Sequence, residues 1–303
     1  MKSAIALLLA ASMSPGWAQI LNKDSLHFKA DGTKVRGSFI LVNRAVPLPE
    51  GEFTLITADF RDSRMSSGNI RLVPHRMVTV VLGQMADGKL RTAVTATTVL
   101  TYHGNTGWVV EPCKADKVVL FRRGSVPFMK RSYEQNCLVV NRVARGLGPN
   151  ATGVFELLRD WTKKEGGEVP IEMRLDATVT RIAQAEYLMV NYFFNPAAYG
   201  CDAANLQSEA FANGVIELGK ALQVAINAGF SGRDRVEKVE RLEADLPRLQ
   251  QDCGRAVQAV APAPRPKAGS AADRLKELDS LRGQGLISPA EYDERRRKIL
   301  DSL

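Results

Sequence analysis

Residues 78–100 read VTVVLGQMADGKLRTAVTATTVL, and this stretch decides the fold of the N-terminal part of the chain. Its two halves, Val78–Gln84 and Leu90–Leu100, are rich in β-branched residues and flank the dipeptide Asp87-Gly88. An Asp-Gly step between two such runs is a strong signal for a tight β-hairpin. We therefore expect an antiparallel hairpin inside a β-rich domain.

Further strand signals surround this hairpin. The other short segments rich in strand-forming residues are Ser38–Val42, Glu52–Asp59, Trp108–Glu111, Val118–Phe121 and Leu138–Arg142. Glycine and proline separate these segments at short intervals, as in a sandwich, a barrel or a strongly bent sheet. Apolar and polar residues alternate from Ile171 to Val179, and the apolar run Tyr187–Phe194 follows. These two segments are expected to pair and to complete the sheet.

One helix is expected inside this domain, at Gly153–Lys164. Its apolar residues that share one helical face are Val154, Leu157, Leu158 and Trp161. Between Leu206 and Val257 the apolar residues recur at helical spacing in two stripes, separated by Gly229-Phe230-Ser231-Gly232. This pattern predicts an antiparallel hairpin of two helices of about 21–23 residues each. The β-rich domain therefore spans residues 19–200 and the helical hairpin residues 201–257.

The N-terminus has the features of a secretory signal peptide. Lys2 supplies the positive flank, Ala4–Ala11 is apolar, and Gly16-Trp17-Ala18 offers small residues for cleavage after Ala18. The apolar run is too short to cross a bilayer, which needs about 20 helical residues. We expect an exported protein, periplasmic or secreted, without a membrane span.

The cysteines fit an oxidising compartment. There are four, Cys113, Cys137, Cys201 and Cys253, which suggests two disulfides among three possible pairings. We favour Cys113–Cys137 and Cys201–Cys253, because the second pair flanks the open end of the helical hairpin. No C-x-x-C pair occurs and no histidine is near in sequence, so we expect neither a metal site nor a cofactor.

Much of the net charge of +8 lies between Lys114 and Arg145, where eight basic residues face two acidic ones. The candidate ligand-binding residues in this segment are Arg122, Arg123, Lys130 and Arg131. In an exported protein they favour an anionic envelope polymer or a lipid head group over nucleic acid. The alternative is a solvated basic loop that binds no ligand.

Catalytic motifs are absent from the sequence, and the three histidines stand alone. The one acid-base grouping worth testing is Asp59 and Asp62 with His75 or His103, which would suit an envelope hydrolase. Paired carboxylates beside Arg61 and Arg64 are more often an exposed ion-pair cluster. We therefore favour a protein that is not an enzyme.

The last residues, Ala271 to Leu303, read AADRLKELDSLRGQGLISPAEYDERRRKILDSL. Two short amphipathic helices are expected on either side of Gly285, and Ser288-Pro289-Ala290-Glu291 forms a capping signal for the second. The matching positions are Leu275, Leu278 and Leu281, then Gly285-Leu286-Ile287-Ser288, Glu291-Tyr292 and Lys298-Ile299-Leu300. With these residues the stretch resembles the SHOCT family, a short C-terminal domain appended to many bacterial proteins.

The resemblance implies an accessory oligomerisation or interaction module without catalytic residues. A two-helix unit of this size, with no metal and no cysteine, buries too little surface to be stable alone, so it is expected to pair with copies of itself or to dock elsewhere. The expected contact residues are Leu275, Leu278, Leu281, Ile287, Tyr292, Ile299 and Leu300. A Pro/Ala-rich linker, residues 258–270, separates this module from the rest.

Together these patterns predict an α+β protein: a β-rich N-terminal domain, an antiparallel helical hairpin and a short two-helix C-terminal module, 271–303. The function that we expect is that of an exported, non-enzymatic bacterial envelope protein. Its partner through the tail is expected to be another copy or a second envelope protein.

Overall fold

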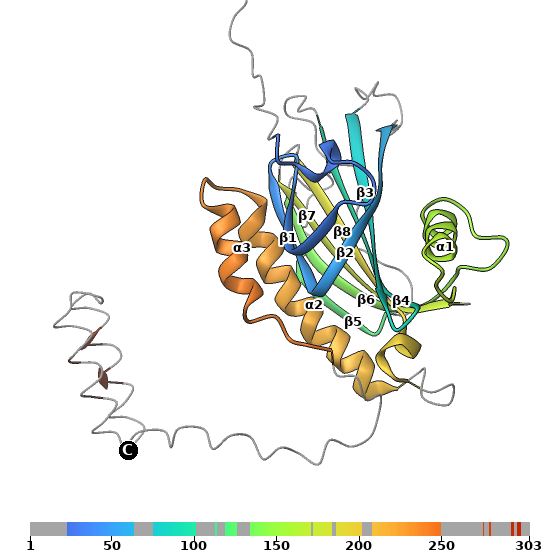
Figure 1. Cartoon of the computed structure of the whole chain (residues 1–303). Helices are drawn as coiled ribbons and strands as arrows, with labels where there is room; N and C mark the ends of the chain where they lie inside the picture. Colours follow the sequence, from blue (N-terminus) through green and yellow to red (C-terminus); the bar gives the residue numbers. More distant parts are fainter. Residues whose placement is uncertain are drawn as a thin grey trace, which may run out of the picture. The chain divides into compact units, whose positions relative to one another are not determined.

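The computed structural model describes residues 23–63, 75–100, 119–125, 134–170, 172–183, 186–201 and 208–249, with Cys113 and six positions of the tail. The chain divides into two compact units, 1–254 and 255–303 (Figure 1). Within the described residues, no helix is long and apolar enough to cross a membrane.

Unit 1 is built on one antiparallel sheet of eight strands in the order β1-β2-β3-β4-β8-β7-β6-β5. The strands are β1 Lys34–Leu41, β2 Arg44–Ser63, β3 His75–Ala86, β4 Lys89–Val99, β5 Phe121–Ser125, β6 Glu134–Gly146, β7 Glu172–Ala183 and β8 Glu186–Phe194. Strands β1–β4 form one meander and β5–β8 form another. The two meanders join where β4 pairs with β8.

The predicted central hairpin is confirmed as β3–β4. Ala86 pairs with Lys89, and the two turn residues, Asp87 and Gly88, both have positive φ, +49° and +70°. Such a turn has the twist that antiparallel strands need, which is why Asp-Gly is favoured there. The predicted pairing of the last two strand segments is also confirmed, as β7–β8.

One predicted strand is displaced. Residues Val118–Phe121 were expected to be extended, whereas β5 runs from Phe121 to Ser125 and so includes two arginines. The observed strand begins at Phe121, the residue of this segment that packs against the core. The predicted strand Trp108–Glu111 lies outside the described residues.

Helices α2 (Glu209–Phe230) and α3 (Arg235–Glu243) lie along one face of the sheet (Figure 1). The predicted stripe on α2 is confirmed, since all five of its members are buried: Phe211, Val215, Leu218, Leu222 and Ile226. They pack on alternate residues of the central strands, such as Leu188, Val190 and Tyr192 of β8. The main core therefore lies between α2 and the sheet.

The second predicted helix is much longer than the one observed. Helix α3 has nine residues and ends at Glu243, three residues before Leu246. Pro247 explains this end, because proline disfavours a helical residue before it and its ring clashes with the carbonyl four positions earlier. Leu246 and Leu249, which belong to the second predicted stripe, still pack against the core. They do so from the non-helical segment that follows α3.

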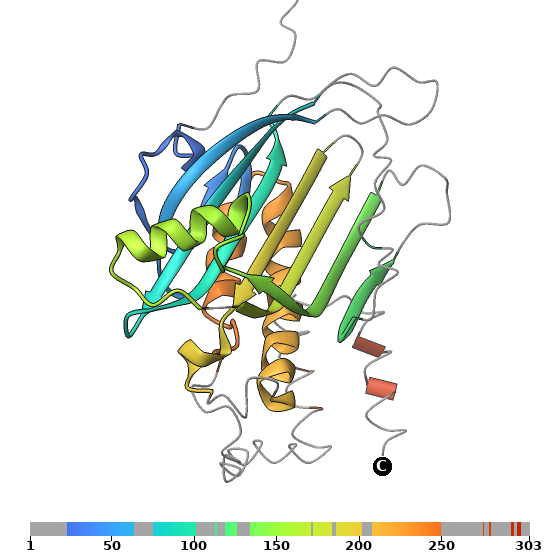
Figure 2. The same cartoon turned by 90° about the vertical axis from the view of Figure 1, so that its right-hand side faces the viewer.

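Helix α1 (Val154–Lys164) covers part of the opposite face, across β2, β3 and β4 (Figure 2). Trp161 lies against Gly83, where an added Cβ would be 2.3 Å from the indole ring. Phe155 packs edge-on to Phe193 at 5.2 Å between ring centroids, and Leu158 is fully buried. Leu157, which was expected on the same face, is instead 39% exposed.

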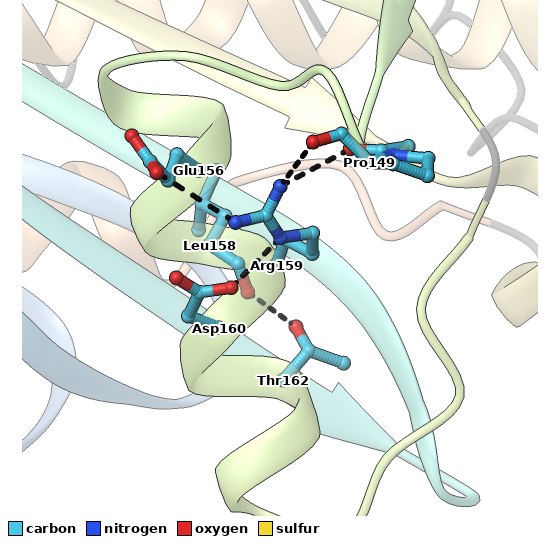
Figure 3. Close-up of polar contacts among 7 residues, drawn as sticks. Pro149, Glu156, Leu158, Arg159, Asp160 and Thr162 are labelled. Carbon is cyan, nitrogen blue, oxygen red and sulfur yellow. Dashed lines mark hydrogen bonds and ion pairs between the residues drawn. The ribbon is translucent and has the colours of Figure 1, made fainter.

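Polar contacts hold α1 to the turn before it (Figure 3). Arg159 Nη1 donates to the carbonyls of Gly148 (3.3 Å) and Pro149 (3.0 Å), and its Nε donates to Asp160 at 2.7 Å. This hydrogen bond from Arg159 lowers the pKa of Asp160. We interpret the group as structural, because each of these contacts is made within or just before α1.

The β1 edge of the sheet is interrupted and partly covered. The β1–β2 register shifts between Arg36 and Ser38, and the intervening Gly37 has φ +72°. The carboxylate of Glu243, on α3, lies over this glycine, 2.7 Å from the position of an added Cβ. Burial raises the pKa of Glu243, and a hydrogen bond with Ser38 opposes that effect. A bulge and a helix end therefore occupy this edge.

Helix α2 approaches the sheet most closely at Gly229, where an added Cβ would lie 2.1 Å from the carbonyl oxygen of Ala45. We expect Gly229→Ala to lower the free energy of unfolding by about 1–3 kcal/mol, because a backbone clash outweighs the better helix propensity of alanine. Gly214→Ala is the matched control, since its Cβ meets only the side chain of Leu249 at 3.3 Å. Urea unfolding measures both, and equal effects would contradict the assigned contact.

Candidate functional site

The basic segment is found at the other edge of the sheet, on β5. Arg122 pairs with Val139 and Arg123 with Leu138, and both arginines are exposed. Because successive strand residues point to opposite faces, the two guanidinium groups flank the edge from both sides rather than converging on one face. A ligand that contacts both must lie along the strand edge. Lys130 and Arg131 lie outside the described residues.

Contacts with α2 fix this edge in place. Phe121, the first residue of β5, packs against the core, and Lys220 Nζ lies 4.9 Å above its ring. Lys220 also pairs with Glu217 at 2.6 Å. This lysine adds a cation near the edge, and it was not foreseen because it comes from a distant helix with no local signal in the sequence.

A disulfide anchors the neighbouring strand. Cys113 and Cys137 are bonded, as predicted, with 5.6 Å between their Cα atoms, and both are buried. Opposite Cys137 lies Gly124, with φ +133°, and a Cβ there would be 2.1 Å from the carbonyl oxygen of Asn136. Only glycine fits this position. Cys201 is also disulfide-bonded, and its predicted partner, Cys253, lies outside the described residues.

The acid-base grouping proposed from the sequence remains untested. Asp59 accepts a hydrogen bond from Arg61 Nε at 2.5 Å and is opposite Thr79 in the β2–β3 register. Asp62 is opposite Arg76, and His75 is opposite Ser63. The side chains of Asp62 and His75, and the whole of His103, lie outside what the structure describes. Among the described residues, no group of three or more acidic, histidine or cysteine side chains is arranged to hold a metal ion.

Among the six described positions of the tail, one side-chain contact joins the part around Asp279 to the part around Tyr292. Tyr292 is buried, and its hydroxyl donates to Asp279 Oδ1 at 2.5 Å across 13 positions of the chain. Leu275, one turn before Asp279, is half-buried. The other five predicted contact residues, Leu278, Leu281, Ile287, Ile299 and Leu300, lie outside the described residues. Asp279 was not foreseen, because an aspartate on an amphipathic helix looks like part of the solvated face.

The comparisons with known proteins bear only on the tail. The model of the Short C-terminal domain family, SHOCT, matches residues 273–300, so this stretch is a SHOCT domain. No curated protein and no solved structure matches the chain. The sheet and its edges must therefore be interpreted from their own chemistry.

Replacing both Cys113 and Cys137 by serine is expected to lower the free energy of unfolding by about 3 kcal/mol. The bond closes a loop of 24 residues, and opening it releases chain entropy mainly in the unfolded state. Urea unfolding under non-reducing conditions measures the change. A variant as stable as the wild type would show that the bond does not constrain the unfolded chain.

Proposed function

We propose that this chain is an exported, non-enzymatic bacterial envelope protein whose SHOCT domain associates with further copies or with an envelope partner. The observation that supports this most directly is the SHOCT match at residues 273–300, within a compact unit separate from the sheet. Association through the tail would bring several sheet units together or place the sheet unit next to the envelope partner.

The size of the tail favours association. About 30 residues in two helices cannot bury enough apolar surface to be independently stable without a metal or a disulfide. The Tyr292–Asp279 hydrogen bond fixes the two parts relative to each other but adds only about 1 kcal/mol. A partner surface would supply the remaining stabilisation.

The linker sets how far the tail can act. Residues 258–270 are rich in proline and alanine, a composition that behaves as an extended spacer of about 3 Å per residue. Thirteen residues of this kind give a reach of roughly 40 Å. Tails that associate would therefore leave the attached sheet units room to bind separately, and linked copies would gain avidity.

Export is proposed from two features. The N-terminal sequence has the charged, apolar and small-residue regions of a signal peptide, with cleavage near Ala18. The Cys113–Cys137 disulfide fits a compartment outside the reducing cytoplasm. Both favour the periplasm as the place where the protein acts.

A second candidate function is the binding of an anionic envelope polymer along β5. It is favoured by the position of Arg122 and Arg123, exposed on both sides of an outer strand and near Lys220. Neighbouring cations of this kind attract a linear polyanion, and the attraction is screened by salt.

Association through the tail is tested by sedimentation velocity of residues 19–303 over a range of concentrations. We expect Leu275→Asp, like truncation at residue 260, to abolish association, because a charge would be placed in the apolar contact. Arg297→Ala, an exposed position of the same tail, should leave association unchanged. If Leu275→Asp associates as the wild type does, the tail is not the association surface.

Binding at β5 is tested with dextran sulfate as a model polyanion. We expect the double variant Arg122→Glu, Arg123→Glu to bind about tenfold more weakly at low salt, equivalent to about 1.4 kcal/mol. The matched control reverses Lys34 and Arg36 on β1, which changes the net charge equally at the opposite edge. Equal losses in the two variants would mean that only net charge matters.

A further inference from the structure

A buried serine joins the N-terminal turn to the first hairpin. Ser25 precedes the short helix η1 (Leu26–Phe28) and is fully buried. Its Oγ lies 2.6 Å from His27 Nδ1 and accepts a hydrogen bond from the backbone N–H of Val42, also at 2.6 Å. His27 itself is only 6% exposed. One hydroxyl therefore links two segments that are far apart in the chain.

The segment held by Ser25 is a strained turn. Leu41 pairs with Arg44, so Val42 and Asn43 are the two residues that reverse the chain between β1 and β2. Val42 has φ +61°, a conformation that a β-branched residue rarely adopts. Such a backbone persists only where surrounding contacts hold it, and the hydrogen bond to Ser25 is one of these contacts.

We assign the Ser25 hydroxyl as the donor to Nδ1 of His27, because its oxygen already accepts from Val42. In this assignment the neutral imidazole carries its proton on Nε2. A second proton would make Nδ1 a donor as well. Ser25 would then have to turn its hydroxyl proton elsewhere, in a site where it is fully buried.

The surroundings do not favour a positive charge on His27. Helix η1 contacts β1 and β3, and the ring of His27 also lies 6.1 Å from Phe60 on β2. The charged groups on these elements include two cations, Arg44 after the β1–β2 turn and Arg76 over Phe60, and two sets of ion pairs, Asp59 with Arg61 and Glu52 with Lys34 and Arg36. Burial lowers the pKa of His27. Asp24 and Lys29, on the turn itself, are exposed.

We propose that Ser25, His27 and Val42 form an acid-sensitive clasp, which holds the N-terminal turn on the β1–β2 hairpin at neutral pH and releases it when His27 takes up a proton. Release would uncover an aromatic surface, since the ring of His27 lies 4.0 Å from that of Phe28 and 6.1 Å from that of Phe60. These two phenyl rings are already about half exposed, at 51% and 44%.

The direction of the pH dependence follows from linkage. The closed form binds the second proton less readily than the open form, where His27 has its ordinary pKa of about 6.5. The closed form is therefore fully favoured above about pH 6.5 and loses stability as the pH falls below it. The opening equilibrium constant should grow up to about tenfold for each pKa unit that separates the two forms.

The test is amide hydrogen exchange of the mature chain between about pH 7.5 and pH 5, corrected for intrinsic rates, with an NMR titration of its three histidines. We expect protection of the Val42 and Phe28 amides to fall on acidification, by up to about tenfold for each pKa unit that separates the two forms, while Val190 in the central strand β8 stays protected. His27 should be the histidine that titrates with the change.

Two variants distinguish opening of the clasp from acid destabilisation of the whole sheet unit. His27→Gln keeps an acceptor for the Ser25 hydroxyl but cannot titrate, so protection at Val42 should become independent of pH. His75→Gln should leave the wild-type pH dependence intact. The proposal is overturned if protection at Val42 does not change with pH, if it changes equally in His27→Gln, or if Val190 loses protection in parallel.

Discussion

The packing of α2 across both meanders is the constraint on which the rest of the sheet unit depends. Gly219 brings the helix against Leu138 and Ala177, on β6 and β7, while Gly229 brings it against Ala45 on β2. A single helix thus spans the β4–β8 junction on this face of the sheet. Near the helix end, Arg44 and Arg181 lie 5.1 Å and 5.3 Å from the ring of Phe230. Burial lowers the pKa of Arg44 to about 10, so it stays charged at neutral pH and needs its ion pair with Glu186.

The two faces of the sheet serve different purposes in this arrangement. The face under α2 is mostly apolar, and it supplies most of the buried apolar surface of the unit. On the other face, side chains such as Thr79, Thr95 and Asn191 bond to neighbouring strands beside the patch covered by α1. The residues that we assign to binding and to acid sensitivity lie at the margins of the sheet. They can therefore respond to ligands or protons while the core stays packed.

What could be foreseen from the sequence was local. The β3–β4 turn follows from Asp87-Gly88, and the buried face of α2 follows from helical spacing, because each depends on neighbouring residues. The length of α3 was predicted wrongly, although Pro247 in the expected helix was a local signal that should have shortened it. Lys220 contacts Phe121, and Ser25 contacts Val42, across distant segments of the chain. The spacing of residues along the sequence does not predict such contacts. The sequence revealed the basic character of this segment around β5, but the predicted strand ended at Phe121, so the opposite directions of Arg122 and Arg123 were missed.

Among the described strands, β1 and β5 are the outer ones, and this carries a hazard if the tail gathers copies as proposed, because outer strands brought close together can pair and polymerise. At the β1 edge, the irregularity at Gly37 and the overlying Glu243 carboxylate hinder such pairing. At the second edge, β5 is only five residues long and carries adjacent arginines, so two copies repel each other there. The same guanidinium groups that we propose to attract a polyanion would thus also oppose pairing between copies, and replacing them with apolar residues would favour fibre formation.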